Sequence, residues 1–310
     1  MMEEAIRSAP KQRYALRPAT RQGLDAYLLL LPWFAGLIFL TAGPLLSSFY
    51  LAFTDYDMFN SPNWVGLQNF EDMFLYDPRF MTALGVTLTY VLLGVPLNLV
   101  FALGIALLLN LKVRGLGMFR AIYYLPSLLG SSVAVAVMWR QIFGGQGVMN
   151  SLLASFGFVG SNWIAHPSYA LYTLVILHIW QFGSAMIVFL AGLQQIPREL
   201  YEAAEIDGAG PWSKFRRVTL PMLTPVIFFN LVLGVINSFQ AFTAAYIVSG
   251  GSGGPSDATL FYTLYLYQEG FTHFRMGYAS AMGWILLVII GAFTALNFWI
   301  SRRWVFYGDN

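Results

Sequence analysis

Six long apolar segments constrain this chain more than any other feature. They cover residues 26–54, 82–111, 119–143, 168–194, 220–248 and 277–301. Crossing the hydrocarbon core of a bilayer takes about 20 apolar residues in a helix, and each segment is long enough. Only 10% of the residues are charged, whereas soluble domains average about 25%. We therefore expect an all-α polytopic membrane protein with six transmembrane helices.

The distribution of basic residues predicts the orientation of these helices. Fourteen Lys and Arg residues lie before the first segment, after the second, after the fourth and after the sixth; three lie on the other side: Arg79, Arg140 and Arg275. Cytoplasmic loops carry the excess of Lys and Arg, so both termini are expected in the cytoplasm. We interpret 1–25 as a cytoplasmic tail, 26–304 as the membrane domain and 305–310 as the cytoplasmic C-terminus.

The interiors of the six segments contain no Asp, Glu, Lys or Arg. Ion-coupled transporters usually need such a group within the membrane. His178 is the one titratable group that we place mid-segment, and a lone histidine there is more often a packing residue than a proton relay. The chain has no GxxxxGK[ST] or HExxH motif and no cysteine. We expect no catalytic residue, metal or cofactor in this chain, and an energy source in a partner.

Neutral polar and aromatic residues in the fourth and fifth segments form a candidate substrate path: His178, Trp180, Gln181, Ser184, Asn237, Ser238, Phe239 and Gln240. His178, Gln181 and Ser184 are spaced by three residues and share one helical face. Hydrogen bonding between helices, worth about 0.6 kcal/mol per bond, is one interpretation. A hydrated path for a hydroxyl-bearing ligand is the other. The residue types alone favour neither, but neutral amides suit an uncharged polyhydroxyl ligand better than an anion.

The polar loop at 195–219 has the signals of two short helices joined at a glycine. Pro197 can occupy a first helical turn. Gly208 is placed as the left-handed residue that ends the helix, and Pro211 can start a second one. Small side chains would let a soluble partner approach the loop closely: Ala203, Ala204, Gly208 and Ala209.

The same loop carries an ordered set of motifs. Glu202-Ala203-Ala204 is followed by Asp207-Gly208-Ala209 and then by Leu220-Pro221. This order resembles the EAA loop of permease subunits of binding-protein-dependent ABC importers. The resemblance implies that the loop docks on an ATPase subunit through Glu202, Ala203, Ala204, Asp207, Gly208 and Ala209. Glu202 and Gly208 match the hallmark residues of the motif.

Other segments extend the resemblance over about residues 28–300. They are WVGLQNF (64–70), YYLPSLLGSSVAVAVMW (123–139), GVMNSLL (147–153), and the stretches 253–271 and 276–282. They are similar to the carbohydrate-uptake permeases, in particular the maltose-type first permease and the glycerol-3-phosphate permease. The resemblance implies a type I ABC importer permease fold. The additional N-terminal helices and large external insert of the maltose-type protein are missing from this sequence.

The resemblance also implies partners and a location. These are a homologous second permease in a heterodimer, two cytoplasmic ATPase subunits that bind ATP and magnesium, an extracytoplasmic solute-binding protein and a sugar, oligosaccharide or polyol. The chain would be a multi-pass protein of the bacterial cytoplasmic (inner) membrane, in contact with lipid and with no nucleic acid. It would not itself be an enzyme.

Two other functions stay open on the residues alone. An ion-coupled secondary transporter or a channel would act without an ATPase, but needs an ion site that the segments do not offer. An intramembrane transferase would need clustered carboxylates or a metal set near one membrane interface. Asp55 and Asp57, the closest pair, have the pattern of turn residues after the first segment.

Overall fold

The computed structural model describes the backbone of residues 19–111, 115–130 and 132–306, with side chains from residue 27. Within these ranges the regular elements are helices, with one isolated antiparallel bridge between Thr54 and Trp64. Four helices are long and apolar enough to cross a membrane, or six if each of two bent pairs forms one span. The predicted helical membrane class is confirmed. Most of the predicted tail, and Lys112, Arg114 and residues 307–310, lie outside the described residues.

The chain divides into two units, residues 1–50 and 51–310. The first unit contains α1 (Ala19–Gly36), the π-helical η1 (Leu37–Ala42) and α2 (Gly43–Leu51). Residues 27–51 form the apolar span predicted at 26–54, while α1 begins within the stretch interpreted as tail. The π turn directly precedes Pro44, whose ring would clash with the carbonyl four residues earlier in a regular α-helix.

The second unit is organised around α4 (Pro78–Leu109), which contacts α8, α9 and α12. Asp77 starts this helix, because its carboxylate accepts the N–H groups of Arg79 (2.9 Å) and Phe80 (3.2 Å), and Pro78 occupies the first turn. Small buried residues recur along α4 at helical spacing: Ala83, Thr87, Val91, Gly94, Val95, Asn98, Ala102 and Ala106. This stripe lets neighbouring helices approach closely, as in other membrane bundles.

The third predicted span is wrong as a single helix. Instead, α5 (Leu116–Leu129) and α6 (Val133–Ile142) meet at a bend of 98°. The break lies between Leu129 and Val133, next to the small residues Gly130 and Ser132. Ser132 then caps α6, since its hydroxyl accepts the N–H of Val135 at 3.3 Å. A helix end needs such a side-chain acceptor for its unpaired N–H groups.

The fourth and fifth predicted spans also differ from continuous helices. α8 (Pro167–Trp180) and α9 (Gly183–Gln195) are bent by 41° at Gln181. α12 (Leu220–Phe239) stops nine residues before the predicted end, and α13 (Thr243–Ser249) follows as a separate helix. The Ala241 carbonyl in this break accepts the Thr263 hydroxyl, so a tertiary contact replaces helical continuation.

The fifth span is longer at its other end, because α11 (Pro211–Lys214) and the π-helical η3 (Phe215–Thr219) run directly into α12. Residues 211–239 are therefore one helix. α15 (Met276–Ser301) agrees with the sixth predicted span. Shorter elements complete the unit: α3 (Gln68–Glu71), η2 (Asp72–Tyr76), α7 (Val148–Ser155), α10 (Arg198–Ile206), α14 (Tyr262–Tyr267) and η4 (Gln268–Thr272).

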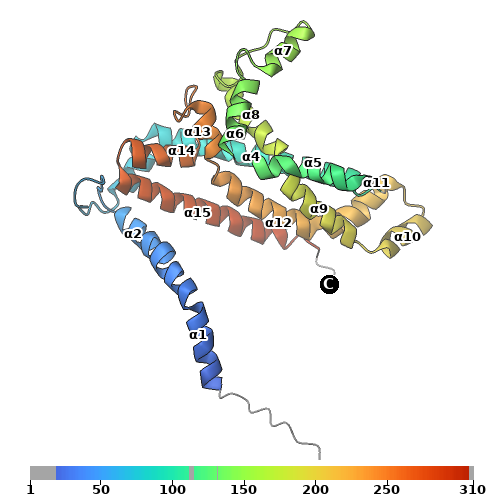
Figure 1. Ribbon diagram of the computed structural model, residues 1–310, viewed down its shortest axis with the longest axis horizontal. Helices are drawn as coiled ribbons and strands as arrows, with labels where there is room; N and C mark the ends of the chain where they lie inside the picture. The colour runs from blue at the N-terminus through green and yellow to red at the C-terminus, as the bar shows by residue number, and fades with distance from the viewer. Residues whose placement is uncertain (1–18, 112–114, 131, 307–310) are drawn as a thin grey trace, which may run out of the picture. The chain divides into compact units, whose positions relative to one another are not determined.

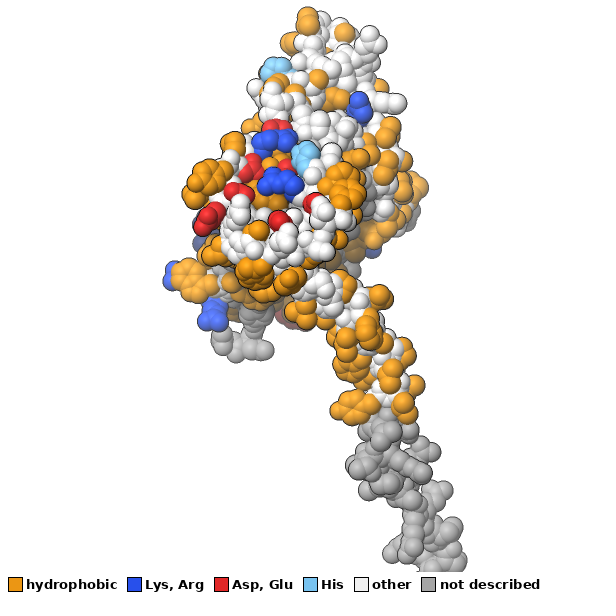
Figure 2. Space-filling model, turned by 90° about the vertical axis from the view of Figure 1, so that its left-hand side faces the viewer, with side chains coloured by type: hydrophobic (Ala, Val, Ile, Leu, Met, Phe, Trp, Pro, Cys, Tyr) orange, Lys and Arg blue, Asp and Glu red, His pale blue; other side chains and the backbone are white. Residues whose placement is uncertain are grey.

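In this unit α4, α12 and α15 run side by side, with α10 and α11 at one end and α14 at the other (Figure 1). We call these the α10 end and the α14 end. Figure 2 shows acidic, basic and histidine side chains gathered on the α14 end, surrounded by apolar ones. The α14 end of the unit therefore carries a cluster of charged side chains.

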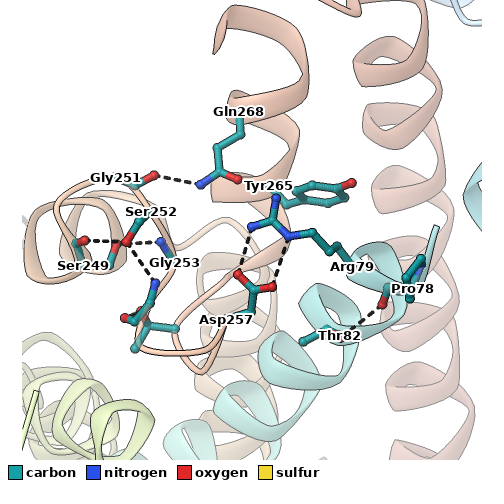
Figure 3. A network of polar contacts seen from close by, with 12 residues as sticks. Pro78, Arg79, Thr82, Ser249, Gly251, Ser252, Gly253, Asp257, Tyr265 and Gln268 are labelled. Carbon is teal, nitrogen blue, oxygen red and sulfur yellow. Dashed lines mark hydrogen bonds and ion pairs between the residues drawn. The ribbon is translucent and has the colours of Figure 1, made fainter. Parts of the chain in front are cut away.

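Charged side chains at the α14 end join loops to helices. Arg79 holds Asp257 through two nitrogens, at 3.1 and 2.9 Å, and its guanidinium lies over the ring of Tyr265 (Figure 3). Asp77 accepts the hydroxyls of Tyr265 (2.5 Å) and Tyr278 (2.6 Å). Burial would raise the pKa of Asp77, but these hydroxyls and two backbone N–H groups outweigh it, so that pKa lies below its usual value. The loop at 250–261 is thus fastened to the start of α4.

Candidate functional site

A cavity of about 550 Å³ opens between the helices of the second unit. α4, α5, α6, α8, α9, α12 and α13 all contribute to its wall. Polar side chains are frequent there: Tyr90, Asn98, Ser127, Ser132, His178, Gln181, Ser184, Asn230, Asn237, Ser238, Gln240 and Thr243. None of the described residues in this wall is charged. Its chemistry is that of neutral hydrogen-bonding groups set among apolar ones, and its size falls in the usual range for small-ligand sites.

Six of the eight residues predicted for the substrate path line this cavity: His178, Gln181, Ser184, Asn237, Ser238 and Gln240. Trp180 instead packs against a cluster around Trp139, with the two rings 6.1 Å apart. Phe239 is 1% exposed and packs on Phe293, with the ring centroids 5.1 Å apart. Phe239 therefore lies in the protein core, whereas Trp180 is half-buried against its cluster, and neither ring lines the cavity.

Asn98 and Tyr90 line the cavity but were not predicted, although the sequence around Asn98 carries a signal for it. Asn98 lies within the second apolar segment, where a buried amide is as conspicuous as Asn237 is in the fifth. Its side-chain N–H donates to the carbonyl of His178 at 2.7 Å. Tyr90 stands two turns earlier on α4, and its ring is 5.5 Å from the His178 ring. Together they position the last turn of α8.

Hydrogen bonds at the cavity wall join the breaks of the third and fourth spans. The Ser127 hydroxyl donates to the Gln181 carbonyl and accepts the Ser184 N–H, both at 2.9 Å. The Gln181 amide donates to the carbonyl of Gly130, also at 2.9 Å. The helix breaks leave these backbone groups without helical partners, and side chains from the other span satisfy them. Gln181 thus has a structural role at the wall.

Replacing Gly183 with Ala is expected to destabilise this junction. A Cβ at that position would lie 2.6 Å from the Tyr123 carbonyl and 2.7 Å from the Ser127 hydroxyl. Relief of such overpacking typically costs about 1–3 kcal/mol of unfolding free energy. We expect a lower thermal unfolding midpoint in detergent. Gly104→Ala is the matched control, since nothing lies within 4 Å of the added methyl group; equal midpoints for the two variants would contradict the close approach.

Among the described residues of the wall, Ser238 carries a buried polar atom with no partner. The hydroxyl of Ser238 is buried and makes no hydrogen bond, and the residue is 2% exposed. Unsatisfied buried hydroxyls are rare, and each calls for an explanation such as an ion, water or ligand. Ser238 sits beside Asn237 on the last turn of α12. This turn thus holds a hydrogen-bonding group that the described residues leave unsatisfied.

At the α10 end, the loop carrying the E-A-A and D-G-A motifs is a helix, a glycine elbow and a second helix. Two backbone hydrogen bonds cap the C-terminus of α10. The Ala209 N–H donates to the Ala204 carbonyl at 2.8 Å, and the Gly208 N–H donates to the Glu205 carbonyl at 2.9 Å. Gly208 has φ +76° and nothing within 4 Å of its missing side chain. The requirement for glycine is therefore one of backbone conformation.

The motif residues form part of the surface of this end. Glu202, Ala203, Asp207 and Gly208 are exposed, and Ala204 and Ala209 are half-buried. Apolar side chains beside them are exposed too: Ile206 at 88% and Trp212 at 71%. A surface that combines exposed large apolar side chains with acids and small residues is typical of a contact site for another protein.

The family described as binding-protein-dependent transport system inner membrane component matches residues 79–305, more than half of the chain. The chain belongs to this family. The probable ABC transporter permease protein YesP of Bacillus subtilis (strain 168) is 50% identical over 295 residues, 94% of each chain. The arabinooligosaccharides transport system permease protein AraP of the same organism is 35% identical, over 85% of this chain and 84% of its own.

The permease fold is also seen in a solved structure. A bacterial alginate ABC transporter, crystallised in complex with an alginate pentasaccharide-bound periplasmic protein, contains a chain that superposes with a TM-score of 0.78. The two are 24% identical, and the match covers 91% of this chain and 96% of that one. The predicted permease assignment and fold are confirmed, and the protein is a multi-pass membrane protein of an ABC importer.

Proposed function

We propose that this permease forms one half of the translocation path for a sugar, oligosaccharide or polyol. The cavity of about 550 Å³, walled by neutral amides and hydroxyls, carries this proposal. Such groups hydrogen-bond to hydroxyls, and the Ser238 hydroxyl has no partner among the described residues. The relative AraP is named for arabinooligosaccharides, which belong to the same chemical class. His178, Gln181, Ser184, Asn237, Ser238 and Gln240 would line the path, with Trp180 and Phe239 supporting it from behind.

The other half of the path would come from a homologous second permease. Two cytoplasmic ATPase subunits would bind ATP and magnesium, and this chain would hold no cofactor. A solute-binding protein would deliver the ligand at the α14 end, where charged side chains lie on an exposed face surrounded by hydrophobic ones (Figure 2). In this arrangement the protein lies in the inner membrane, and the α10 end and both termini face the cytoplasm, as the distribution of Lys and Arg indicates.

Coupling would pass through the exposed motif residues of the α10 end: Glu202, Ala203, Ala204, Asp207, Gly208 and Ala209. Closure of the ATPase dimer would move two docked loops of this kind together, one from each permease. The continuous helix over residues 211–239 connects the loop to the cavity wall. Movement of the loop would then open the cavity alternately to the two sides of the membrane.

Reconstitution of the intact complex tests this function. The chain is co-expressed with its neighbouring permease, ATPase and binding protein, purified and placed in liposomes. Uptake of the ligand held by the binding protein is measured with ATP inside or outside, and with an imposed proton or sodium gradient in its place. ATP-dependent uptake of a carbohydrate or polyol is expected. Uptake by this chain alone, driven by an ion gradient, would support the secondary-transporter alternative instead.

A further inference from the structure

The elbow between α10 and the fifth span is crossed by a hydrogen bond between two side chains. The Tyr201 hydroxyl on α10 lies 2.9 Å from the hydroxyl of Thr219. Thr219 is the last residue of the π-helical η3, directly before α12. Thr219 is 5% exposed and Tyr201 is half-buried against the apolar cluster that contains Leu193 and Leu223. The bond is therefore partly shielded from water, which strengthens it relative to a fully exposed contact. The Thr219 hydroxyl also lies 3.5 Å from the Lys214 carbonyl, to which it donates.

Without this bond the connection would depend on a flexible segment. The residues that join the two helices include Gly208 and Gly210, and glycine restricts the backbone least of all residues. A second contact across the elbow joins Lys214 and Glu205 at 2.6 Å, but the Glu205 side chain is 62% exposed. Exposed ion pairs contribute little, and salt screens them. The buried hydroxyl pair is the stronger constraint.

The helix that receives this constraint reaches the cavity. Thr219 lies in the helix of residues 211–239, whose far turns contribute Asn230, Asn237 and Ser238 to the cavity wall. A helix transmits displacement along its length, whereas a glycine elbow absorbs it.

We propose that Tyr201 and Thr219 are positioning residues for energy coupling, which brace α10 against the base of the fifth span so that both move as one body. This inference rests on the proposed coupling function of the α10 end. In this proposal, motion is transferred from the loop to the cavity by a hydroxyl pair that lies outside the docking surface itself.

The test removes each hydroxyl with little change of shape, through Tyr201→Phe and Thr219→Val, in the reconstituted complex. Ligand uptake and ATP hydrolysis are measured in the same liposomes. We expect uptake per ATP to fall roughly fivefold in either variant, the scale of one net hydrogen bond, with the ATPase still bound. The double variant should be no worse than Thr219→Val alone, because the bond that Tyr201→Phe removes is already lost in Thr219→Val. Thr219→Ser, which keeps the hydroxyl, should restore wild-type coupling.

Amide hydrogen exchange of residues 198–209 gives a readout that does not depend on transport. Exchange there should accelerate in Tyr201→Phe and Thr219→Val and stay at the wild-type rate in Thr219→Ser. Thr89→Val is the control, because it removes a hydroxyl that bonds only within α4, to the Gly85 carbonyl at 2.8 Å.

Two results would overturn the brace: unchanged exchange and coupling in both hydroxyl-deleted variants, or failure of Thr219→Ser to rescue them. The second would mean that packing at Thr219, and not its hydroxyl, is what matters. A wild-type complex that hydrolyses ATP without any uptake would instead refute the proposed function. Exchange in the loop would still report whether the brace exists, so the two failures are distinguishable.

Discussion

Gly208→Val is expected to leave the permease in the membrane and bound to its ligand-delivery partner, while uptake per ATP falls roughly tenfold. A β-branched residue at φ +76° raises the conformational free energy of the backbone by about 1–2 kcal/mol. The two capping hydrogen bonds at the end of α10, which set the direction of the chain after the helix, would then be lost. Glu202→Lys should have a similar effect by reversing an exposed charge of the proposed docking surface. The measurement is uptake and ATP hydrolysis in liposomes, with membrane insertion checked by fractionation.

Gly208→Asn is the matched control for this prediction. Asparagine adopts the left-handed conformation more readily than other non-glycine residues, and the open space around Gly208 accommodates its side chain. It should therefore retain most of the coupling that Gly208→Val loses. Wild-type coupling in both Gly208→Val and Glu202→Lys would show that this loop does not carry energy from the ATPase.

Filling the cavity should stop transport without stopping ATP hydrolysis. Ser184 lines the cavity, and its contact with Ser127 uses the backbone N–H, so replacement of its side chain keeps that bond. Ser184→Trp places a large rigid ring in a space of about 550 Å³. We expect uptake to fall more than tenfold, because a bulky ligand can no longer pass, while basal ATP hydrolysis changes less than twofold.

Ser184→Ala separates the loss of space from the loss of the hydroxyl. If the hydroxyl only contributes one contact to the ligand, this variant should lose less than tenfold in uptake. Normal uptake in Ser184→Trp would place the translocation path elsewhere, for example wholly on the second permease. The thermal unfolding midpoint of both variants shows whether the fold is intact.

Local patterns predicted the loop at the α10 end in detail. Pro197, Gly208 and Pro211 act through their own backbone chemistry, so their positions indicate where helices start and stop. The helix ends at Ile206, and Gly208 adopts positive φ, as the pattern predicts. The pairing of Tyr201 with Thr219 was beyond this reasoning, because the two residues are 18 positions apart and meet only through the fold of the elbow.

The cavity could be predicted only in part. Polar residues inside apolar segments indicated half of its polar wall residues, since such groups are costly in lipid and turn toward the protein interior. Their roles were not predictable. Gln181 bonds to Gly130 across two broken helices, and Phe239 faces the core although its neighbours Ser238 and Gln240 face the cavity.

The sequence by itself determined the membrane class, the number of apolar segments and the glycine elbow, because bilayer thickness and backbone sterics act on local runs of residues. Only the tertiary structure decided where helices break inside the membrane and which side of each helix meets the cavity. At those places backbone groups released by one helix find partners on another, as Ser127 and Gln181 do. That choice depends on contacts between segments distant in the chain, and no local pattern encodes it.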